Sequence, residues 1–261
     1  MTKTWTLPSN EEFVKEFAPE LLVDEKKRQK VRVSGNKPTV FNFVMDVSGS
    51  MSEYYRTLVD SFNTIMVPGL KGVKQNQLNT VLVGGILFSD KLIPLWPGFK
   101  PVKGLDDAPL NINRINADGL RAQTALYLAM VSALSWTRLE MDKLAKDNLG
   151  VQPRGKICVL TDGANNREPL DAAVVRQALN QHLQRDKQGN PKIQCTLAFL
   201  KTGQGLTEQS AQRVAEATGF EFSGFYDLTT EKIVNGKKQT PQQMFCHFFD
   251  LWSKEQLENK G

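Results

Sequence analysis

Two kinds of hydrophobic pattern alternate along this chain. Continuous apolar runs of strand length are typical of strands buried on both faces of a sheet. They cover residues 39–46, 80–89, 156–161 and 192–200. Apolar residues at every third or fourth position are typical of helices with one buried face. They cover residues 52–66, 124–146, 171–184 and 207–218. Strands separated by helices predict an α/β fold: a Rossmann-like, doubly wound and mostly parallel sheet with helices on both faces.

Turn-forming residues refine the first half of this outline. Residues 92–96 follow a Ser-Asp-Lys turn and are predicted to fold back on the strand 80–89 as the one antiparallel strand of the sheet. Within that strand, Gly84-Gly85 predicts a bulge or the close approach of another segment. Pro68-Gly69 is predicted to end the preceding helix. Residues 97–123 are rich in Pro, Gly, Asn and Asp, and loops of this length are usually functional or mobile.

The last third of the chain has clear helix-end signals. Gly219 stands where a helix over 207–218 needs a left-handed cap, and residues 220–225 are predicted to form the last, edge strand. Thr240-Pro-Gln-Gln is typical of a helix start, with a capping hydroxyl followed by Pro and then by Gln at the third position. The helix that follows carries an apolar stripe expected to pack in the core: Met244, Phe245, Phe248, Phe249 and Trp252.

Residues 1–37 do not fit the strand–helix alternation. Glu11 to Leu22 have the spacing of an amphipathic helix interrupted by Pro19. We therefore predict an N-terminal extension, 1–37, packed on a single domain, 38–261.

Candidate chemistry begins at the end of the first strand. Asp46 ends the run 39–46, and Ser48 and Ser50 follow at every second residue, with Gly49 allowing a tight turn. The three side chains can point at one centre, and such oxygen ligands suit a hard cation, Mg²⁺ above all, with Mn²⁺ or Ca²⁺ as substitutes. Neutral hydroxyl ligands leave the ion able to attract a further anion. The alternative is that Asp46 or Ser48 only caps the next helix.

Two later residues add to this candidate site. Asp162 follows the strand 156–161 in a Thr-Asp-Gly segment, and the carboxyl ends of parallel strands meet at one edge of the sheet, where ligands bind. Thr124 is the only hydroxyl residue between Ser89 and the long helix, so it is the only hydroxyl that the long loop can supply. A helix N-cap is the alternative role for Thr124.

Together these segments resemble the metal-ion-dependent adhesion site of von Willebrand factor A (VWA) domains. In that family an Asp-x-Ser-x-Ser turn is followed by a Thr in a later loop and by the Asp of a Thr-Asp-Gly segment. This chain matches at Asp46, Ser48, Ser50, Thr124 and Asp162. It departs around the threonine, where the family often has Gly-Gly-Thr-Pro and this chain has Arg-Ala-Gln-Thr-Ala.

The resemblance implies a Rossmann-like sheet that carries an ion on its upper rim. It implies that the hydroxyls of Ser48 and Ser50, and of Thr124 in one state, bind the ion directly. Asp46 and Asp162 would bind it directly or through water. The remaining coordination position would take a Glu or Asp side chain from a partner protein. The C-terminal helix of the family can shift with ligand state.

Composition bears on the compartment and on the partners. The three cysteines, Cys158, Cys195 and Cys246, are far apart, have no metal-ligand spacing and lie in apolar stretches, which favours a reducing compartment. The N-terminal residues lack the basic start and continuous apolar core of a secretory signal, and no apolar stretch is long enough for a membrane span, so we predict a cytoplasmic protein. Such a chain resembles the stand-alone intracellular bacterial VWA members, which are often encoded beside an AAA+ ATPase of the MoxR kind, or with a kinase and a phosphatase in tellurite-resistance-associated clusters.

Two other functions compete with adhesion. A Mg²⁺-dependent phosphatase or phosphotransferase of the haloacid-dehalogenase type needs an acidic residue two positions after the first Asp, but position 48 is Ser. Neither His182 nor His247 falls in a strand-end loop, so we predict a binding protein rather than an enzyme. A nucleic-acid-binding module needs a basic groove, whereas the net charge is only +5 and the Lys and Arg residues are dispersed.

Overall fold

The computed structural model describes residues 8–22, 37–72, 81–106, 110–111, 113, 115, 124–163, 170–182, 192–203, 205–229, 232–234 and 237–255. Side-chain surroundings are described for all of these except 232–239 and 251–255. Several expectations concern residues outside these ranges: most of the extension 1–37, the loop residues 116–123 with the Arg-Ala-Gln before Thr124, residues 183–184, and the side chain of Trp252.

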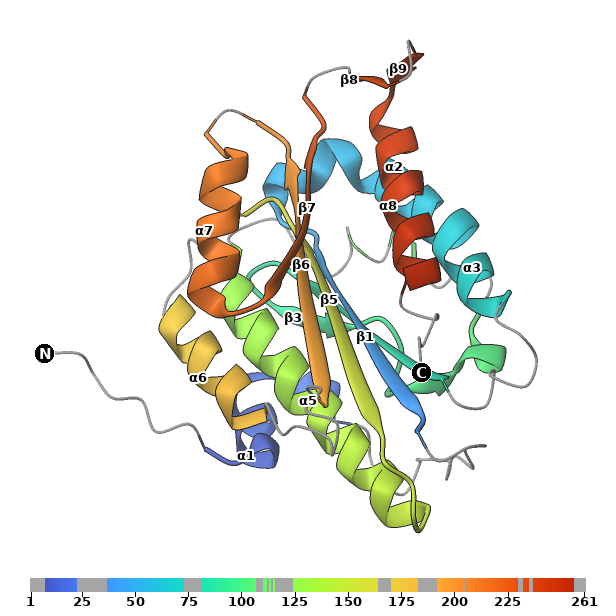
Figure 1. The fold of residues 1–261 in the computed structure, drawn as a ribbon, viewed down its shortest axis with the longest axis vertical. Coiled ribbons are helices and arrows are strands. Elements are labelled where there is room, and N and C mark those ends of the chain that lie inside the picture. Colours follow the sequence, from blue (N-terminus) through green and yellow to red (C-terminus); the bar gives the residue numbers. More distant parts are fainter. Residues whose placement is uncertain are drawn as a thin grey trace, which may run out of the picture.

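The sheet at the centre of the molecule is mostly parallel (Figure 1). Its parallel strands, in spatial order, are β2 (Val81–Phe88), β1 (Thr39–Asp46), β5 (Arg154–Thr161), β6 (Ile193–Lys201) and β7 (Glu221–Asp227). The chain passes from β1 to β2 on one side and then forms β5 on the other side of β1. The topological switch point therefore lies at the carboxyl end of β1, where doubly wound sheets bind ligands.

Two antiparallel strands pair with β2, whereas the sequence predicts one. The expected strand is present as β3 (Leu92–Pro94), and β4 (Lys100–Pro101) pairs with the first half of β2 inside the segment predicted as an irregular loop. Gly84 explains how the chain returns so closely, because a Cβ atom there would lie 2.6 Å from the ring of Phe99. The Gly84-Gly85 signal thus marks a close approach, as the sequence predicts.

Helices cover both faces of the sheet (Figure 1). One face carries α1 (Asn10–Phe17), α5 (Leu126–Asp147), α6 (Ala172–His182) and α7 (Glu208–Thr218). The other face carries α2 (Tyr55–Ser61), α3 (Val67–Lys71) and α8 (Pro241–Glu255). Each face has its own hydrophobic cluster, so the doubly wound α/β fold is confirmed.

The prediction that Pro68-Gly69 ends the helix is wrong, because the helical segment continues past these two residues. The helical backbone runs from a 3₁₀ turn, Gly49–Tyr54, through α2 and a π-helical turn, Phe62–Met66, to the end of α3 at Lys71. A π turn changes the hydrogen-bond register, and Pro68 then falls in the first turn of α3. A first-turn residue needs no amide proton, so the proline is tolerated.

The other end signals act as predicted. Gly219 ends α7 with φ 80°, in the left-handed region, and the N-cap of this helix is Thr207. The Thr240 hydroxyl accepts the amide proton of Gln243, whose side chain accepts that of Thr240, which starts α8. The α8 stripe, apart from Trp252, is buried against the sheet: Met244, Phe245, Phe248 and Phe249.

The N-terminal helix packs on the sheet domain. Ser9 and Glu12 form a capping box at the start of α1, and Phe13 and Val14 are buried in the cluster that includes α5. Three small elements complete the described fold: a 3₁₀ turn, Pro19–Leu21, after α1; another 3₁₀ turn, Val102–Gly104, after β4; and the two-stranded sheet β8 (Lys232–Val234) and β9 (Lys237–Gln239) before α8. The division into 1–37 and 38–261 stays a prediction.

Candidate metal site

Asp46 is the last residue of the central strand β1, and its carboxyl group is buried, with 1% of the residue exposed. The Ser48 amide donates to Asp46 Oδ1 at 2.9 Å, and the Thr161 hydroxyl donates to Oδ2 at 2.8 Å. The first bond belongs to the local turn, as the capping alternative expects. The second comes from the end of the neighbouring strand β5, so the carboxylate also joins two strand ends.

The serine hydroxyls of the turn face the same place. Ser48 precedes the 3₁₀ turn, but its side chain makes no capping hydrogen bond to that turn. Its Oγ lies 3.2 Å from Ser50 Oγ, and the Ser50 hydroxyl donates to Asp162 Oδ2. Capping therefore does not account for Ser48. Its hydroxyl contributes to a cluster of oxygen atoms that extends from β1 to the residue after β5.

Asp162 is held at the carboxyl end of β5 by a tight turn. It is 8% exposed, and Thr202 Oγ1, just beyond β6, lies 3.5 Å from its Oδ2. The following Gly163 has φ 87°, and its amide donates to Thr161 Oγ1 at 3.1 Å. A Cβ atom at Gly163 would lie 2.8 Å from the Leu206 side chain. The Thr-Asp-Gly segment therefore needs its glycine for both backbone conformation and space.

The Asp46 and Asp162 carboxylates of the site interact electrostatically. Burial, followed by the negative charge of Asp162, raises the pKa of Asp46 to about 7, although hydrogen bonds from Ser48 and Thr161 oppose the shift. Two close carboxylates repel each other when both are ionised, and a divalent cation between them would remove that repulsion. The oxygen atoms of Asp46, Ser48, Ser50 and Asp162 are the ligand type that Mg²⁺, Mn²⁺ and Ca²⁺ take, so these residues fit such an ion.

Thr124 lies at the same edge of the sheet, beside the end of β2. It is buried, and it is not the N-cap of α5: that position is Ala125, with no side-chain capping bond. The Ala125 amide donates to the Ser89 carbonyl at 2.7 Å, and the Val47 amide donates to the Phe88 carbonyl at 2.9 Å. The N-cap position of α5 therefore falls to Ala125 and not to Thr124, whose segment is fixed beside the end of β2.

Three residues beside the site were not among the predicted ligands. Thr161 and Thr202 contact the two carboxylates, as described above. Tyr55 is buried, and its hydroxyl donates to the carbonyl oxygens of Val47 and Ser48, the latter at 2.8 Å. Thr161 has a sequence signal, because it belongs to the Thr-Asp-Gly segment. For Thr202 and Tyr55, the hydrophobic pattern gives no signal of a role at the site.

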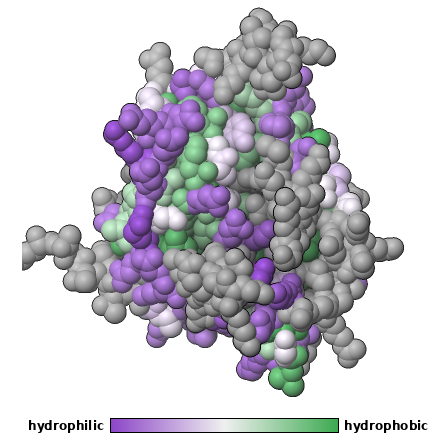
Figure 2. Space-filling view, viewed as in Figure 1, coloured by the Kyte–Doolittle hydropathy of each residue, from purple (hydrophilic) through white to green (hydrophobic). Residues whose placement is uncertain are grey.

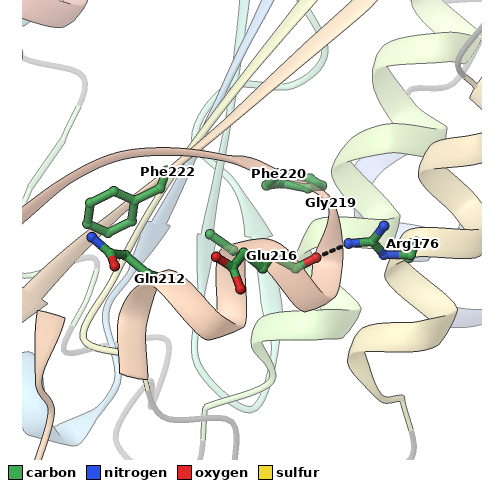
Figure 3. A pocket seen from close by; sticks show the side chains of 7 residues that line it. Arg176, Gln212, Glu216, Gly219, Phe220 and Phe222 are labelled. Carbon is green, nitrogen blue, oxygen red and sulfur yellow. Dashed lines mark hydrogen bonds between the residues drawn. The ribbon is translucent and has the colours of Figure 1, made fainter. Parts of the chain in front are cut away.

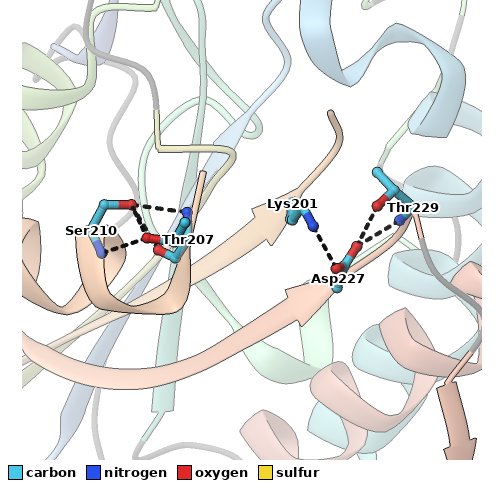
Figure 4. Close-up of polar contacts among 5 residues, drawn as sticks. All are labelled: Lys201, Thr207, Ser210, Asp227 and Thr229. Carbon is cyan, nitrogen blue, oxygen red and sulfur yellow. Dashed lines mark hydrogen bonds and ion pairs between the residues drawn. The ribbon is translucent and has the colours of Figure 1, made fainter. Parts of the chain in front are cut away.

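An ion pair fixes the neighbouring strand ends at the rim (Figure 4). Lys201 Nζ lies 2.8 Å from Asp227 Oδ2, and Thr229 donates to Asp227 Oδ1 through both its amide and its hydroxyl. Burial acts to raise the pKa of Asp227, but the bonds from Lys201 and Thr229 outweigh it and lower that pKa to about 2. The pair therefore ties β6 to β7 one residue before Thr202.

A separate groove lies at the other end of the sheet (Figure 3). It has a volume of about 500 Å³ and is lined by Arg176, Gln212, Ala215, Glu216, Gly219, Phe220 and Phe222. The Arg176 guanidinium donates to the backbone carbonyls of Glu216 and Ala217, so it caps the end of α7. The outward face of α7 is the purple, polar band in Figure 2, beside a green area. The groove lies at the amino end of β7, away from the switch point.

Other chemistry has less support within the described residues. No three His, Cys, Asp or Glu side chains come together there, so a metal would need the hydroxyl ligands named above. Cys158 and Cys195 are buried thiols, and Cys246 is a half-buried one. No helix in the described part of the chain is both long and apolar enough to cross a bilayer.

Comparison with known proteins supports the fold. No protein-family model and no curated protein matches the sequence. Among solved structures, the chain is similar to the open conformation of the pilus adhesin SpaC from Lactobacillus rhamnosus GG, with a TM-score of 0.56 and 11% identity over 87% of this chain and 31% of that one. It is also similar to the PilB minor pilin from Streptococcus sanguinis, with a TM-score of 0.52 and 11% identity over 87% of this chain and 63% of that one.

These likenesses concern the fold alone, because the identities are low. The chain spans about a third of the adhesin and less than two thirds of the pilin. A manganese-loaded TRAP protein from Plasmodium vivax also matches, at a TM-score of 0.40 and 16% identity over 74% of this chain and 69% of that one. That score is too low to bear on the chemistry of this chain. The shared fold is the doubly wound α/β architecture that the resemblance to VWA domains implies.

Proposed function

We propose that this protein is a divalent-cation-dependent protein-interaction module that binds an acidic side chain of a partner at the Asp46 site. The observation that carries the proposal is the convergence of Asp46, Ser48, Ser50 and Asp162 at the switch point of the sheet. One of the solved structures with a similar fold is a pilus adhesin, which is consistent with an interaction role for this fold.

Each residue has a role in this proposal. Ser48 and Ser50 offer neutral oxygen ligands, and Asp46 and Asp162 supply the negative charge that attracts a dication. Thr124, just before α5, is expected to supply a further hydroxyl. When bound, the cation supplies a Lewis acid that accepts one carboxylate oxygen from the partner. Mg²⁺ is the proposed ion, with Mn²⁺ or Ca²⁺ as substitutes.

A binding role is favoured over catalysis by the positions of the titratable groups. His182 lies buried in α6 and His247 lies in α8, so neither histidine belongs to the turns that follow the parallel strands. Position 48 carries a serine, which cannot act as the acid–base group of a phosphotransferase. A screen for phosphatase and nuclease activity with Mg²⁺ tests this part of the proposal, and turnover that Asp46→Ala abolishes would contradict it.

The partner and the compartment are also proposals. We expect a protein that offers a Glu or Asp, such as an AAA+ ATPase or a kinase or phosphatase encoded nearby, in the cytoplasm. Nucleic acid is a less suitable partner because the basic residues are dispersed.

A pull-down from native lysate with Mg²⁺ and with excess chelator tests the proposal directly. We expect a partner that is retained with Mg²⁺ and released by chelator. Asp46→Ala should abolish this retention while circular dichroism shows an unchanged fold. Partner binding that persists in chelator, or in a folded Asp46→Ala variant, would contradict a cation-dependent site.

A further inference from the structure

Tyr55 lies directly behind the turn that carries the candidate ligands. It is the first residue of α2, is 4% exposed, and belongs to the hydrophobic cluster beneath α8. Its single hydroxyl proton is directed at two backbone carbonyls, those of Val47 and Ser48. Tyr55 therefore has two parts with different roles: a ring that packs in the core and a hydroxyl that binds the turn.

The first carbonyl determines how the turn presents Asp46. The Val47 carbonyl and the Ser48 amide belong to the same planar peptide unit and point in opposite directions. Tyr55 binds this unit on the carbonyl side, and Asp46 Oδ1 accepts its amide proton at 2.9 Å on the other side. The peptide is thus held at both ends, which limits the rotation of the backbone on the amino side of Ser48.

The second carbonyl fixes the backbone on the other side of the same serine. The Ser48 carbonyl accepts the Met51 amide at 3.0 Å and the Tyr55 hydroxyl at 2.8 Å. Both peptide units that flank Ser48 are therefore bound by one hydroxyl group. The direction of the Ser48 side chain follows from these two units, and its Oγ lies 3.2 Å from Ser50 Oγ.

We infer that Tyr55 is a positioning residue for the cation site: its hydroxyl orients the turn so that Ser48 and Asp46 face the ion together. The inference rests on the proposed function, because it assigns Tyr55 to the same site. Tyr55 touches neither the ion nor the partner. Groups that orient metal ligands from behind in this way typically change metal affinity 10- to 100-fold when they are removed.

The test compares Tyr55→Phe with Tyr54→Phe in the full chain. Phe keeps the buried ring of Tyr55 and removes only the hydroxyl. Tyr54 is the matched control, because it is the preceding residue and its hydroxyl has no hydrogen-bond partner within the described ranges. The probe is Mn²⁺ alone, with unbound Mn²⁺ measured by electron paramagnetic resonance. Tyr55→Phe should weaken Mn²⁺ binding about tenfold or more, and Tyr54→Phe should stay within about twofold of wild type.

Urea unfolding in excess chelator separates positioning from general stability. A purely structural role for the hydroxyl would lower the unfolding midpoint of the metal-free chain and leave Mn²⁺ affinity unchanged. Titrations at 10 °C keep a destabilised variant folded, with circular dichroism as the check. Tyr55→Phe binding Mn²⁺ as tightly as wild type would overturn the assignment of Tyr55 alone. A wild-type chain that binds no Mn²⁺, or an Asp46→Ala chain that binds it equally well, would overturn the proposed site itself.

Discussion

Replacing Gly163 by alanine perturbs the turn that presents Asp162, and the structure allows its cost to be worked out. Gly163 has φ 87°, where an alanine costs about 1–2 kcal/mol because its Cβ crowds the following carbonyl. That Cβ would also lie 2.8 Å from Leu206 and 3.1 Å from Phe199. Overpacking of this kind costs about 1–3 kcal/mol. Gly163→Ala should therefore lower the free energy of unfolding by about 2–5 kcal/mol.

Gly150 provides the matched control for this prediction. It has φ 82°, close to that of Gly163, but a Cβ atom there would meet nothing within 4 Å. Gly150→Ala should cost only the backbone part, about 1–2 kcal/mol. It should also leave Mn²⁺ affinity unchanged, since Gly150 lies in the turn after α5. Gly163→Ala should weaken Mn²⁺ binding, because relief of the clash moves the residue next to Asp162.

Urea denaturation in chelator gives the two free energies, and Mn²⁺ titration of the folded variants gives the affinities. The difference in the free energy of unfolding between the two alanine variants gives the cost of the clash with Leu206 and Phe199. Equal destabilisation of both variants would refute the packing argument. A large loss of stability at Gly163 with unchanged Mn²⁺ affinity would refute the link between this turn and the metal site.

Two further predictions concern other residues. Burial, followed by the charge of Arg138, lowers the pKa of His182 to about 4. The stability provided by the neutral ring is complete above the unfolded pKa near 6.5 and is lost as the pH falls toward 4. Between pH 7 and pH 5, the free energy of unfolding should therefore fall by about 2 kcal/mol more in wild type than in His182→Gln. Equal falls in the two proteins would contradict this prediction. Thr202→Val removes the hydroxyl near Asp162 and should weaken Mn²⁺ binding several-fold by calorimetry. Thr64→Val, on the exposed side of a helix, should not change it, and equal affinities for both variants would exclude a role for Thr202.

The hydrophobic pattern predicts the sheet well because its strands are buried on both faces. A run such as 39–46 contains enough apolar residues to be recognised without any knowledge of its neighbours. β4 is different, since Lys100 and Pro101 have no strand pattern of their own and pair with β2 only because Gly84 leaves room for Phe99. The wrong helix end at Pro68 has a similar explanation. The π turn before it lets the helix continue past the proline, and residue spacing does not reveal that turn.

Some residues of the candidate site can be predicted from sequence, and others are revealed only by the structure. Asp46, Ser48, Ser50 and Asp162 can be placed together from sequence, because parallel strands bring their carboxyl ends to one edge. Tyr55 fits an apolar helix position equally well, so its hydroxyl contact with the turn emerges only from coordinates. Thr202 likewise gains its role from the pairing of β6 beside β5.

Diffraction at the manganese absorption edge from crystals grown with Mn²⁺ tests the central claim most directly. We expect one anomalous peak per chain, at about 2.0–2.6 Å from the hydroxyl oxygens of Ser48 and Ser50 and beside the carboxylates of Asp46 and Asp162. The peak should be absent from Asp46→Ala crystals grown in the same way. A peak elsewhere on the molecule, or none at saturating Mn²⁺, would contradict a cation site at the switch point of the sheet.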